Sequence, residues 1–141
     1  MSSTTYLILN TEQEKSRLQI FQHNYNRVTS TMHSVLESAV RKIDIILFQE
    51  PWIESENLTV SHSAFTSIIP VTELRSRVIT FILKANCNLK FTSRSDILTD
   101  NDLQALSISM SNLKEFLLLN IYNEKSLQEK SSKYTVERAL N

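Results

Sequence analysis

Three polar side chains stand at the ends of apolar segments, where their chemical types could bind a metal ion or a phosphate. Asn24 ends "RLQIFQHN", Glu50 follows "IDIILFQ" and Tyr122 follows "LLLNI". A carboxylate at the end of an apolar segment is costly unless a cation or solvent takes up its charge. Mg²⁺ accepts carboxylate and amide oxygens together with water and a substrate phosphate, and a tyrosine hydroxyl can orient a phosphate oxygen. These residue types therefore indicate a magnesium-dependent phosphate site, provided that the fold brings them together.

A purely structural role would explain the same residues. Glu50 could form an ion pair with Arg27 or Lys42, and Asn24 could cap the helix that follows it. Spacing along the chain does not distinguish these roles, so both interpretations stay open at this point.

The apolar pattern predicts the elements that must position these residues. Segment 17–24 carries apolar residues on both faces and segment 43–49 is a short apolar run, as expected of strands inside a sheet. Between them, apolar residues recur at helical spacing over 28–41. Strand, helix and strand in succession predict a βαβ unit with parallel strands. The carboxyl ends of these strands, and with them Asn24 and Glu50, should meet at one edge of the sheet.

The rest of the chain is mostly strand-like. The predicted strands are 63–70, 77–84, 103–110 and 114–122, with a hairpin-like turn at Ser111-Asn112 and a short helix that begins near Ser131 or Ser132. The pattern predicts the α+β class, with a βαβ unit followed by mostly antiparallel strands in layered sheets. A domain over 17–141 is expected, preceded by a flexible polar arm over 1–16.

Composition excludes several classes of protein. The 15 basic and 15 acidic residues cancel, so the chain as a whole lacks the basic footprint of a nucleic-acid-binding protein. A single cysteine excludes a disulfide scaffold or thiolate zinc cluster. The absence of glycine excludes the phosphate-binding glycine loops, so tight turns must use Asn, Asp and Ser. No signal peptide and no run of roughly 20 apolar residues is present, so an intracellular protein, nuclear or cytoplasmic, is expected.

Local basic patches could still form within this neutral composition. The candidates for such a patch are Arg75, Arg77, Lys84, Lys90 and Arg94. A solvated charged face is the preferred interpretation of these residues.

Several segments, taken in order, resemble a known family. "RLQIFQHNYNR", a helical segment and "IDIILFQEPW" resemble the start of the endonuclease domain of LINE-type (non-LTR) retrotransposons, in the endonuclease/exonuclease/phosphatase superfamily. "SHSAF", "RVITFILK" and "LLLNIYNE" resemble the next strands of that family, so the resemblance covers about residues 17–125. It implies a four-layered α/β sandwich, here in partial form, and magnesium-dependent cleavage of phosphodiester bonds in DNA.

The resemblance also implies roles for individual residues. Asn24 and Glu50 match metal-binding positions, and Tyr122 matches the tyrosine that contacts the scissile phosphate. Substrate-binding positions are implied at Asn26, Arg27 and Asn120, and a packing or DNA-facing position at Trp52.

The chain departs from the family in its later motifs. A "GDFN"-like motif and a closing Ser-Asp-His motif have no counterpart in the 141 residues, and the three histidines match no catalytic position. A positioned acid or base typically contributes about 10²–10⁴-fold to the rate. We therefore expect weak Mg²⁺ binding and no activity in this chain alone, as in a truncated, retrotransposon-derived endonuclease or pseudoenzyme.

Two other interpretations remain open. The chain could be a co-opted, non-catalytic module that keeps part of the fold and binds a protein partner through exposed strands. It could also be an unrelated small α+β binding module.

Overall fold

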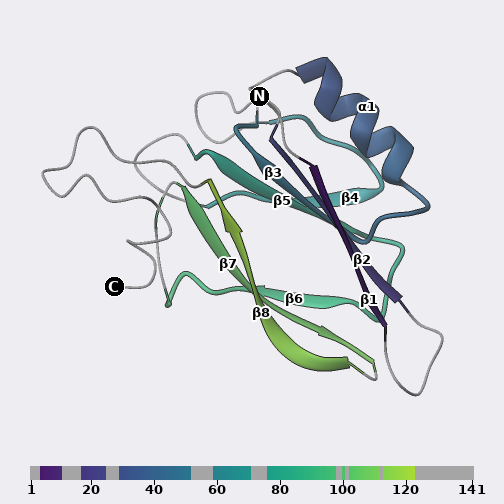
Figure 1. The fold of residues 1–141 in the computed structure, drawn as a ribbon, viewed down its shortest axis with the longest axis vertical. Helices are drawn as coiled ribbons and strands as arrows, with labels where there is room; N and C mark the ends of the chain where they lie inside the picture. Colours follow the sequence, from purple (N-terminus) through teal and green to yellow (C-terminus); the bar gives the residue numbers. More distant parts are fainter. Residues whose placement is uncertain are drawn as a thin grey trace, which may run out of the picture.

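The computed structural model describes residues 4–10, 17–24, 29–51, 59–70, 76–97, 100, 102–111 and 113–122. Within these residues the chain forms two sheets and one helix (Figure 1). The five-stranded sheet has the order β1 (Thr4–Asn10), β2 (Arg17–Asn24), β3 (Ile45–Gln49), β5 (Val78–Leu83) and β4 (Phe65–Ile68). The three-stranded sheet has the order β6 (Lys90–Ser93), β7 (Leu103–Met110) and β8 (Leu113–Ile121). The helix is α1 (Thr29–Ala39).

The predicted βαβ unit is present. β2 and β3 are parallel neighbours, and α1 connects them. The pairs that follow, β3 with β5, β4 with β5 and the three strands of the smaller sheet, are antiparallel. The α+β class is therefore confirmed.

The structure differs from the sequence prediction at two strands. Thr4–Asn10, expected within a flexible arm, form β1, whose backbone pairs antiparallel with the side of β2 that β3 leaves open. β6 was not predicted because all four of its residues are exposed, so it has no apolar pattern. Residues 1–3 and 11–16 of the predicted arm, and the predicted helix near Ser131, lie outside the described residues.

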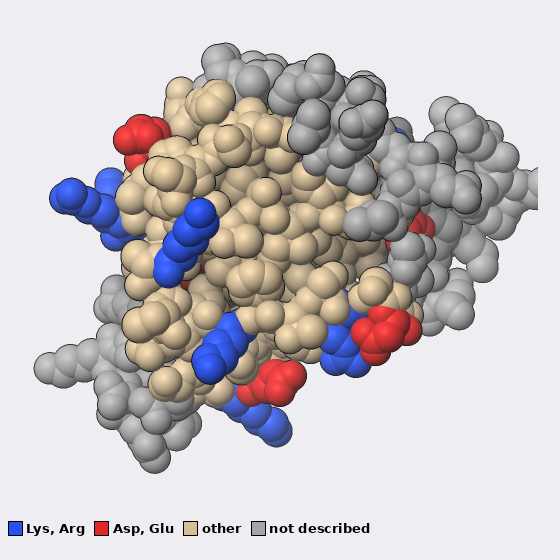
Figure 2. Space-filling model, turned by 180° about the vertical axis from the view of Figure 1, so that it is seen from behind, with Lys and Arg blue, Asp and Glu red and all other residues tan. Residues whose placement is uncertain are grey.

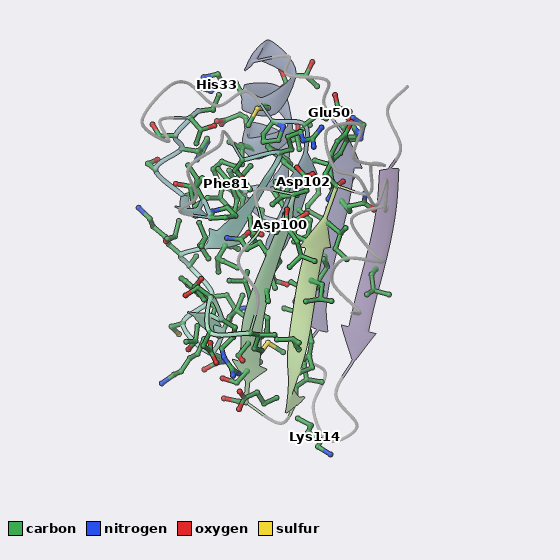
Figure 3. The ribbon with its side chains drawn as sticks, turned by 90° about the vertical axis from the view of Figure 1, so that its left-hand side faces the viewer. His33, Glu50, Phe81, Asp100, Asp102 and Lys114 are labelled. Carbon is green, nitrogen blue, oxygen red and sulfur yellow. The ribbon has the colours of Figure 1, made fainter. Side chains whose placement is uncertain are left out.

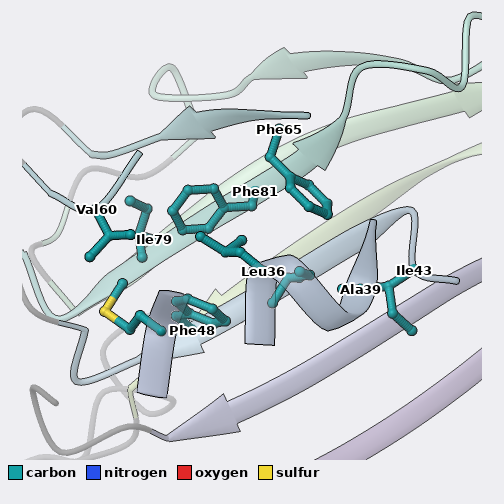
Figure 4. Close-up of a cluster of buried hydrophobic side chains, with 10 residues drawn as sticks. Leu36, Ala39, Ile43, Phe48, Val60, Phe65, Ile79 and Phe81 are labelled. Carbon is teal, nitrogen blue, oxygen red and sulfur yellow. The ribbon is translucent and has the colours of Figure 1, made fainter. Parts of the chain in front are cut away.

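The helix packs on the face of the larger sheet that points away from the smaller one. Met32, Leu36 and Ala39 are buried at helical spacing, as the periodicity predicted. They contact a cluster in which the ring of Phe81 lies 5.3 Å from that of Phe48 (Figure 4). Among the described residues, no helix has the length and apolar character needed to span a membrane.

A second apolar cluster lies between the two sheets. It consists of Leu18, Ile20, Ile45, Leu47, Ile82, Leu89, Leu106, Ile108 and Met110. Residues on β3 alternate between the two clusters, because successive side chains of a strand point to opposite faces. All five residues of β3 are therefore buried, and its carboxyl end is fixed between helix and second sheet.

Candidate functional site

One end of the sandwich brings Asn24, Glu50 and Tyr122 together. The parallel register pairs Asn24 with Gln49, so Glu50 follows directly at the same sheet edge. The Asn24 amide Nδ2 donates to the Glu50 carboxylate at 3.3 Å. The Tyr122 hydroxyl, at the carboxyl end of β8, also hydrogen-bonds to Glu50. Glu50 lies near one end of the molecule and Lys114 at the other (Figure 3).

Glu50 has an unusual backbone conformation. Its φ is 49°, in the left-handed region, and no other described non-glycine residue has a positive φ. Such a conformation costs about 1–2 kcal/mol for a residue with a Cβ. The Glu50 amide still donates to the Arg77 carbonyl at 2.9 Å, which extends the pairing of β3 with β5 by one bond. Backbone strain of this kind is concentrated at functional sites in proteins.

The Tyr122 hydroxyl stays protonated well above neutral pH. Burial, the hydrogen bond to Glu50 and the negative charges of Glu50 and Asp102 together raise the pKa of Tyr122 to about 12, against the opposing charge of Arg77. The hydroxyl can therefore donate a hydrogen bond to Glu50 or to a phosphate oxygen, and it does not act as a base near neutral pH.

An ion pair that the sequence did not reveal borders these residues. Arg77 donates from Nε and Nη2 to the two carboxylate oxygens of Asp102, both at 2.6 Å. The Arg77 guanidinium carbon lies 4.7 Å from the centre of the Tyr122 ring. Arg77 and Asp102 precede β5 and β7, where no local sequence signal links them.

Asn120 lies in the interior between the sheets. It is 1% exposed, accepts a hydrogen bond from Gln49 Nε2 at 2.6 Å and donates to the Ile79 carbonyl at 3.0 Å and to Thr80 Oγ1 at 3.2 Å. Through these contacts Asn120 has a structural role, because it joins β8 of the smaller sheet to β3 and β5 of the larger one. Its role as a substrate-binding residue stays a prediction.

The structure bears on the alternative, purely structural roles of the site residues. Lys42 precedes β3 and Glu50 follows it, so the two stand at opposite ends of the strand and do not pair. Asn24 is the last residue of β2 and contacts Glu50. The proposed partner Arg27, with Asn26 and Trp52, lies outside the described residues.

The histidines do not join this site. His62 Nδ1 accepts a hydrogen bond from the Ala64 amide at 3.0 Å, and its Nε2 lies 2.8 Å from Glu37. Since Nδ1 accepts, Nε2 carries the proton and donates it to Glu37. The ring thereby ties the turn before β4 to α1, which is a structural role. His33 is exposed on α1.

The site residues fit part of a magnesium shell. Within the described segments, no group of three or more His, Cys, Asp or Glu could hold a metal ion. Mg²⁺, however, is commonly held by one or two carboxylates with water and phosphate in the other positions. Glu50 supplies a carboxylate and Asn24 an amide oxygen, once the amide rotates its Oδ1 toward the ion. The remaining positions would belong to water and substrate.

The fold is that of a known endonuclease domain. The solved endonuclease domain of TRAS1, a telomere-specific non-LTR retrotransposon, matches with a TM-score of 0.59 at 18% sequence identity. The match covers 81% of this chain and 48% of that domain, so the chain spans about half the length of the solved structure. No family model and no curated protein sequence matches. The LINE-type endonuclease resemblance is thus confirmed at the level of the fold.

Proposed function

We propose that this chain carries the metal-binding half of a retrotransposon-type endonuclease domain, which cleaves phosphodiester bonds in DNA with Mg²⁺, and that these residues do not cleave DNA by themselves. The observation that carries the proposal is the contact of Asn24 and Tyr122 with Glu50. These residues stand at the ends of strands of two different sheets and meet at one end of the sandwich. The fold shared with the TRAS1 endonuclease domain supports the same assignment.

In this proposal each side chain has a separate task. A bound Mg²⁺ would neutralise phosphate charge and lower the pKa of a bound water molecule. The Glu50 carboxylate and the Asn24 amide oxygen would hold this ion. The protonated Tyr122 hydroxyl donates to a phosphate oxygen and orients the scissile group. Its high pKa keeps the proton in place for this task.

The proposed inactivity rests on the surroundings of the site. Asp102, whose carbonyl accepts from the Tyr122 amide, is held by both of its carboxylate oxygens to Arg77 and is 3% exposed. It is therefore poorly placed to take a proton from water. His62 is bonded to Glu37 on the helix side of the larger sheet. Loss of a positioned acid or base costs about 10²–10⁴-fold in rate.

Manganese binding, followed by electron paramagnetic resonance, tests the proposed metal site. The purified chain should bind Mn²⁺, and Glu50→Gln should weaken binding by about tenfold or more, because it removes the carboxylate charge. Glu115→Gln, at an exposed position of β8, is the matched control and should bind as the unaltered chain does. Equal binding by the Glu50→Gln and Glu115→Gln variants would exclude the site.

Plasmid nicking with Mg²⁺ tests the proposed inactivity. The chain should nick no faster than Glu50→Gln. Robust nicking that disappears in Glu50→Gln would show that the chain is an active nuclease and refute this part of the proposal.

A second candidate function is the protein-interaction module, and the side of the molecule between β1 and β8 favours it. β1 and β8 are the outer strands of their sheets among the described residues. A cavity of about 250 Å³ lies between them, lined by Leu7, Ile20, Gln22, Leu47, Gln49, Leu118, Leu119 and Ile121. Leu7 is 47% and Leu119 38% exposed. An apolar groove beside an outer strand suits an extended segment of a partner protein.

Sedimentation and thermal unfolding distinguish the two candidates. An interaction module should sediment as a monomer and melt cooperatively, with no Mn²⁺ binding that depends on Glu50. Half of a nuclease domain should instead show the Glu50-dependent binding described above. Leu119→Lys should abolish binding of a partner segment in the first case and leave Mn²⁺ binding unchanged in the second.

A further inference from the structure

The Arg77–Asp102 ion pair joins the two sheets at the end that holds Glu50 and Tyr122. Arg77 stands directly before β5 in the larger sheet, and Asp102 directly before β7 in the smaller one. The Asp102 side chain is only 3% exposed, and both of its oxygens accept from Arg77 at 2.6 Å. A carboxylate this deeply buried requires a paired cation. Planar, two-point pairing also fixes the relative orientation of the two side chains.

The backbones of the same two residues hold the candidate site residues. The Arg77 carbonyl accepts from the Glu50 amide at 2.9 Å, and the Asp102 carbonyl accepts from the Tyr122 amide at 2.8 Å. Glu50 is thus tied to Arg77 across β3 and β5, and Tyr122 to Asp102 across β7 and β8. The turn before β7 also holds Asp102, because the Asp102 amide donates to the Asp100 carboxylate at 2.8 Å.

Side chains close these contacts into a ring. The Arg77 guanidinium lies over the Tyr122 ring, with its carbon 4.7 Å from the ring centre, and the Tyr122 hydroxyl bonds to Glu50. The ring of contacts therefore runs from Glu50 through Arg77 and Asp102 to Tyr122 and back to Glu50. Glu50 contacts this ion pair through its backbone, and Tyr122 contacts it through its backbone and its ring.

We infer that Arg77 and Asp102 are positioning residues that set the separation of the Glu50 carboxylate from the Tyr122 hydroxyl, and with it the geometry at which metal and phosphate are held. The inference rests on the proposed function of Glu50 and Tyr122. The two groups belong to different sheets, whose apolar contacts are non-directional. The two-point ion pair adds a directional contact between the sheets at this end, beside the hydrogen bond of Gln49 to Asn120. The Arg77 carbonyl also accepts from the amide of Glu50, whose φ is 49°.

Hydrogen exchange tests the inference without any metal. The amides of Glu50 and Tyr122 should exchange about tenfold faster or more in Asp102→Asn, relative to the amides of Ile46 and Ile108 in the middle of β3 and β7. Arg77→Lys is the second variant, for use if Asp102→Asn does not fold. It keeps the positive charge but loses the two-point bond and the stacking on Tyr122, and it should speed exchange of the same two amides.

The chain offers a matched control for these variants. Arg94 donates from Nε and Nη2 to Asp96 at 2.9 Å, in the same two-point geometry, but on the exposed turn between β6 and β7. Arg94→Lys should leave the exchange of the Glu50 and Tyr122 amides unchanged. Uniformly faster exchange across both sheets in Arg77→Lys, or no change at Glu50 and Tyr122, would overturn the inference.

Mn²⁺ binding provides the second measurement. Arg77→Lys and Asp102→Asn should weaken it by about 10–100-fold, as loss of groups that orient metal ligands does, and Arg94→Lys should not weaken it. If the unaltered chain binds no Mn²⁺, the proposed function fails, while the exchange measurement still decides whether Arg77 and Asp102 position the two groups. Unchanged binding in both variants, with the unaltered chain binding Mn²⁺, would also overturn the inference.

Discussion

At the scale of single residues, Glu50 combines a strained backbone with a charged side chain. Its φ of 49° is a conformation that glycine adopts at little cost, and the chain contains no glycine. The side chain instead contacts Asn24 and Tyr122. For stability alone, glutamate is an unfavourable residue at this conformation. Its presence here agrees with a functional role for the carboxylate, because strained residues are concentrated at functional sites.

Replacing Glu50 separates the backbone cost from the side-chain contacts. Glu50→Gly and Glu50→Ala remove the same contacts, but only alanine retains the cost of the left-handed conformation. We expect the glycine variant to be more stable than the alanine variant by about 1 kcal/mol, measured by urea unfolding. Equal stability of the two variants would show that the turn relaxes to another conformation.

The pKa of Tyr122 predicts a loss of stability at high pH. The folded protein holds it at about 12, against an ordinary value of 10.0 in the unfolded chain. Between these values the unfolded state loses the proton and the folded state keeps it. The contribution of Tyr122 to the free energy of unfolding is therefore complete below about pH 10 and falls as the pH rises toward 12. Tyr122→Phe should flatten this part of the pH dependence of Tm, and an unchanged slope would contradict the assignment.

At the scale of elements, a chain of polar side chains runs through the interior between the sheets. Gln22 donates to Gln49, Gln49 to Asn120, Asn120 to Thr80, and Thr80 to Gln104. Gln104 in turn donates to the Ile68 carbonyl at 3.0 Å. The chain thereby links strands of both sheets, and satisfied buried networks of this kind favour one arrangement of the elements over others.

Asn120 is the member of this network whose loss should cost most, because it joins β8 to both β3 and β5. Asn120→Ala leaves the buried Gln49 amide without its acceptor and should destabilise the protein by about 1–3 kcal/mol, measured by urea unfolding. Leu117→Ala, on the same strand but 46% exposed, should change stability by less than about 0.5 kcal/mol. Equal effects of the two variants would mean that the network contributes nothing beyond packing.

At the scale of the whole molecule, the charges of the described residues are of mixed sign on the face that Figure 2 shows. On the face shown in Figure 2, Lys and Arg side chains stand apart, with Asp and Glu among them. Arg77 and Arg94, two of the basic residues that could have clustered, are each bonded to an aspartate. Their charges are therefore largely neutralised by their partners.

This charge distribution predicts weak binding of DNA. Affinity for a duplex depends chiefly on clustered basic residues that displace counterions from phosphates. We expect a Kd weaker than about 10⁻⁴ M at physiological salt, measured by fluorescence anisotropy with a labelled duplex. Binding in the micromolar range with a steep salt dependence would reveal a basic surface beyond the described residues.

The sequence by itself determined the elements whose apolar pattern is local. The bounds of β2 and β7, the helical face of Met32 and Leu36, and the parallel pairing of β2 with β3 all followed from periodicity and order along the chain. That pairing also predicted the meeting of Asn24 with Glu50, since the ends of adjacent parallel strands share one sheet edge.

Only the tertiary structure showed which residues of the two sheets contact one another. The pairing of Arg77 with Asp102, the burial of Asn120 and the approach of Tyr122 to Glu50 join residues far apart in the sequence. β1 likewise depends on a tertiary contact, because its backbone pairs with the side of β2 that β3 leaves unpaired. Periodicity reports which face of one element is apolar, whereas these contacts depend on how two sheets are stacked and aligned, which no local pattern encodes.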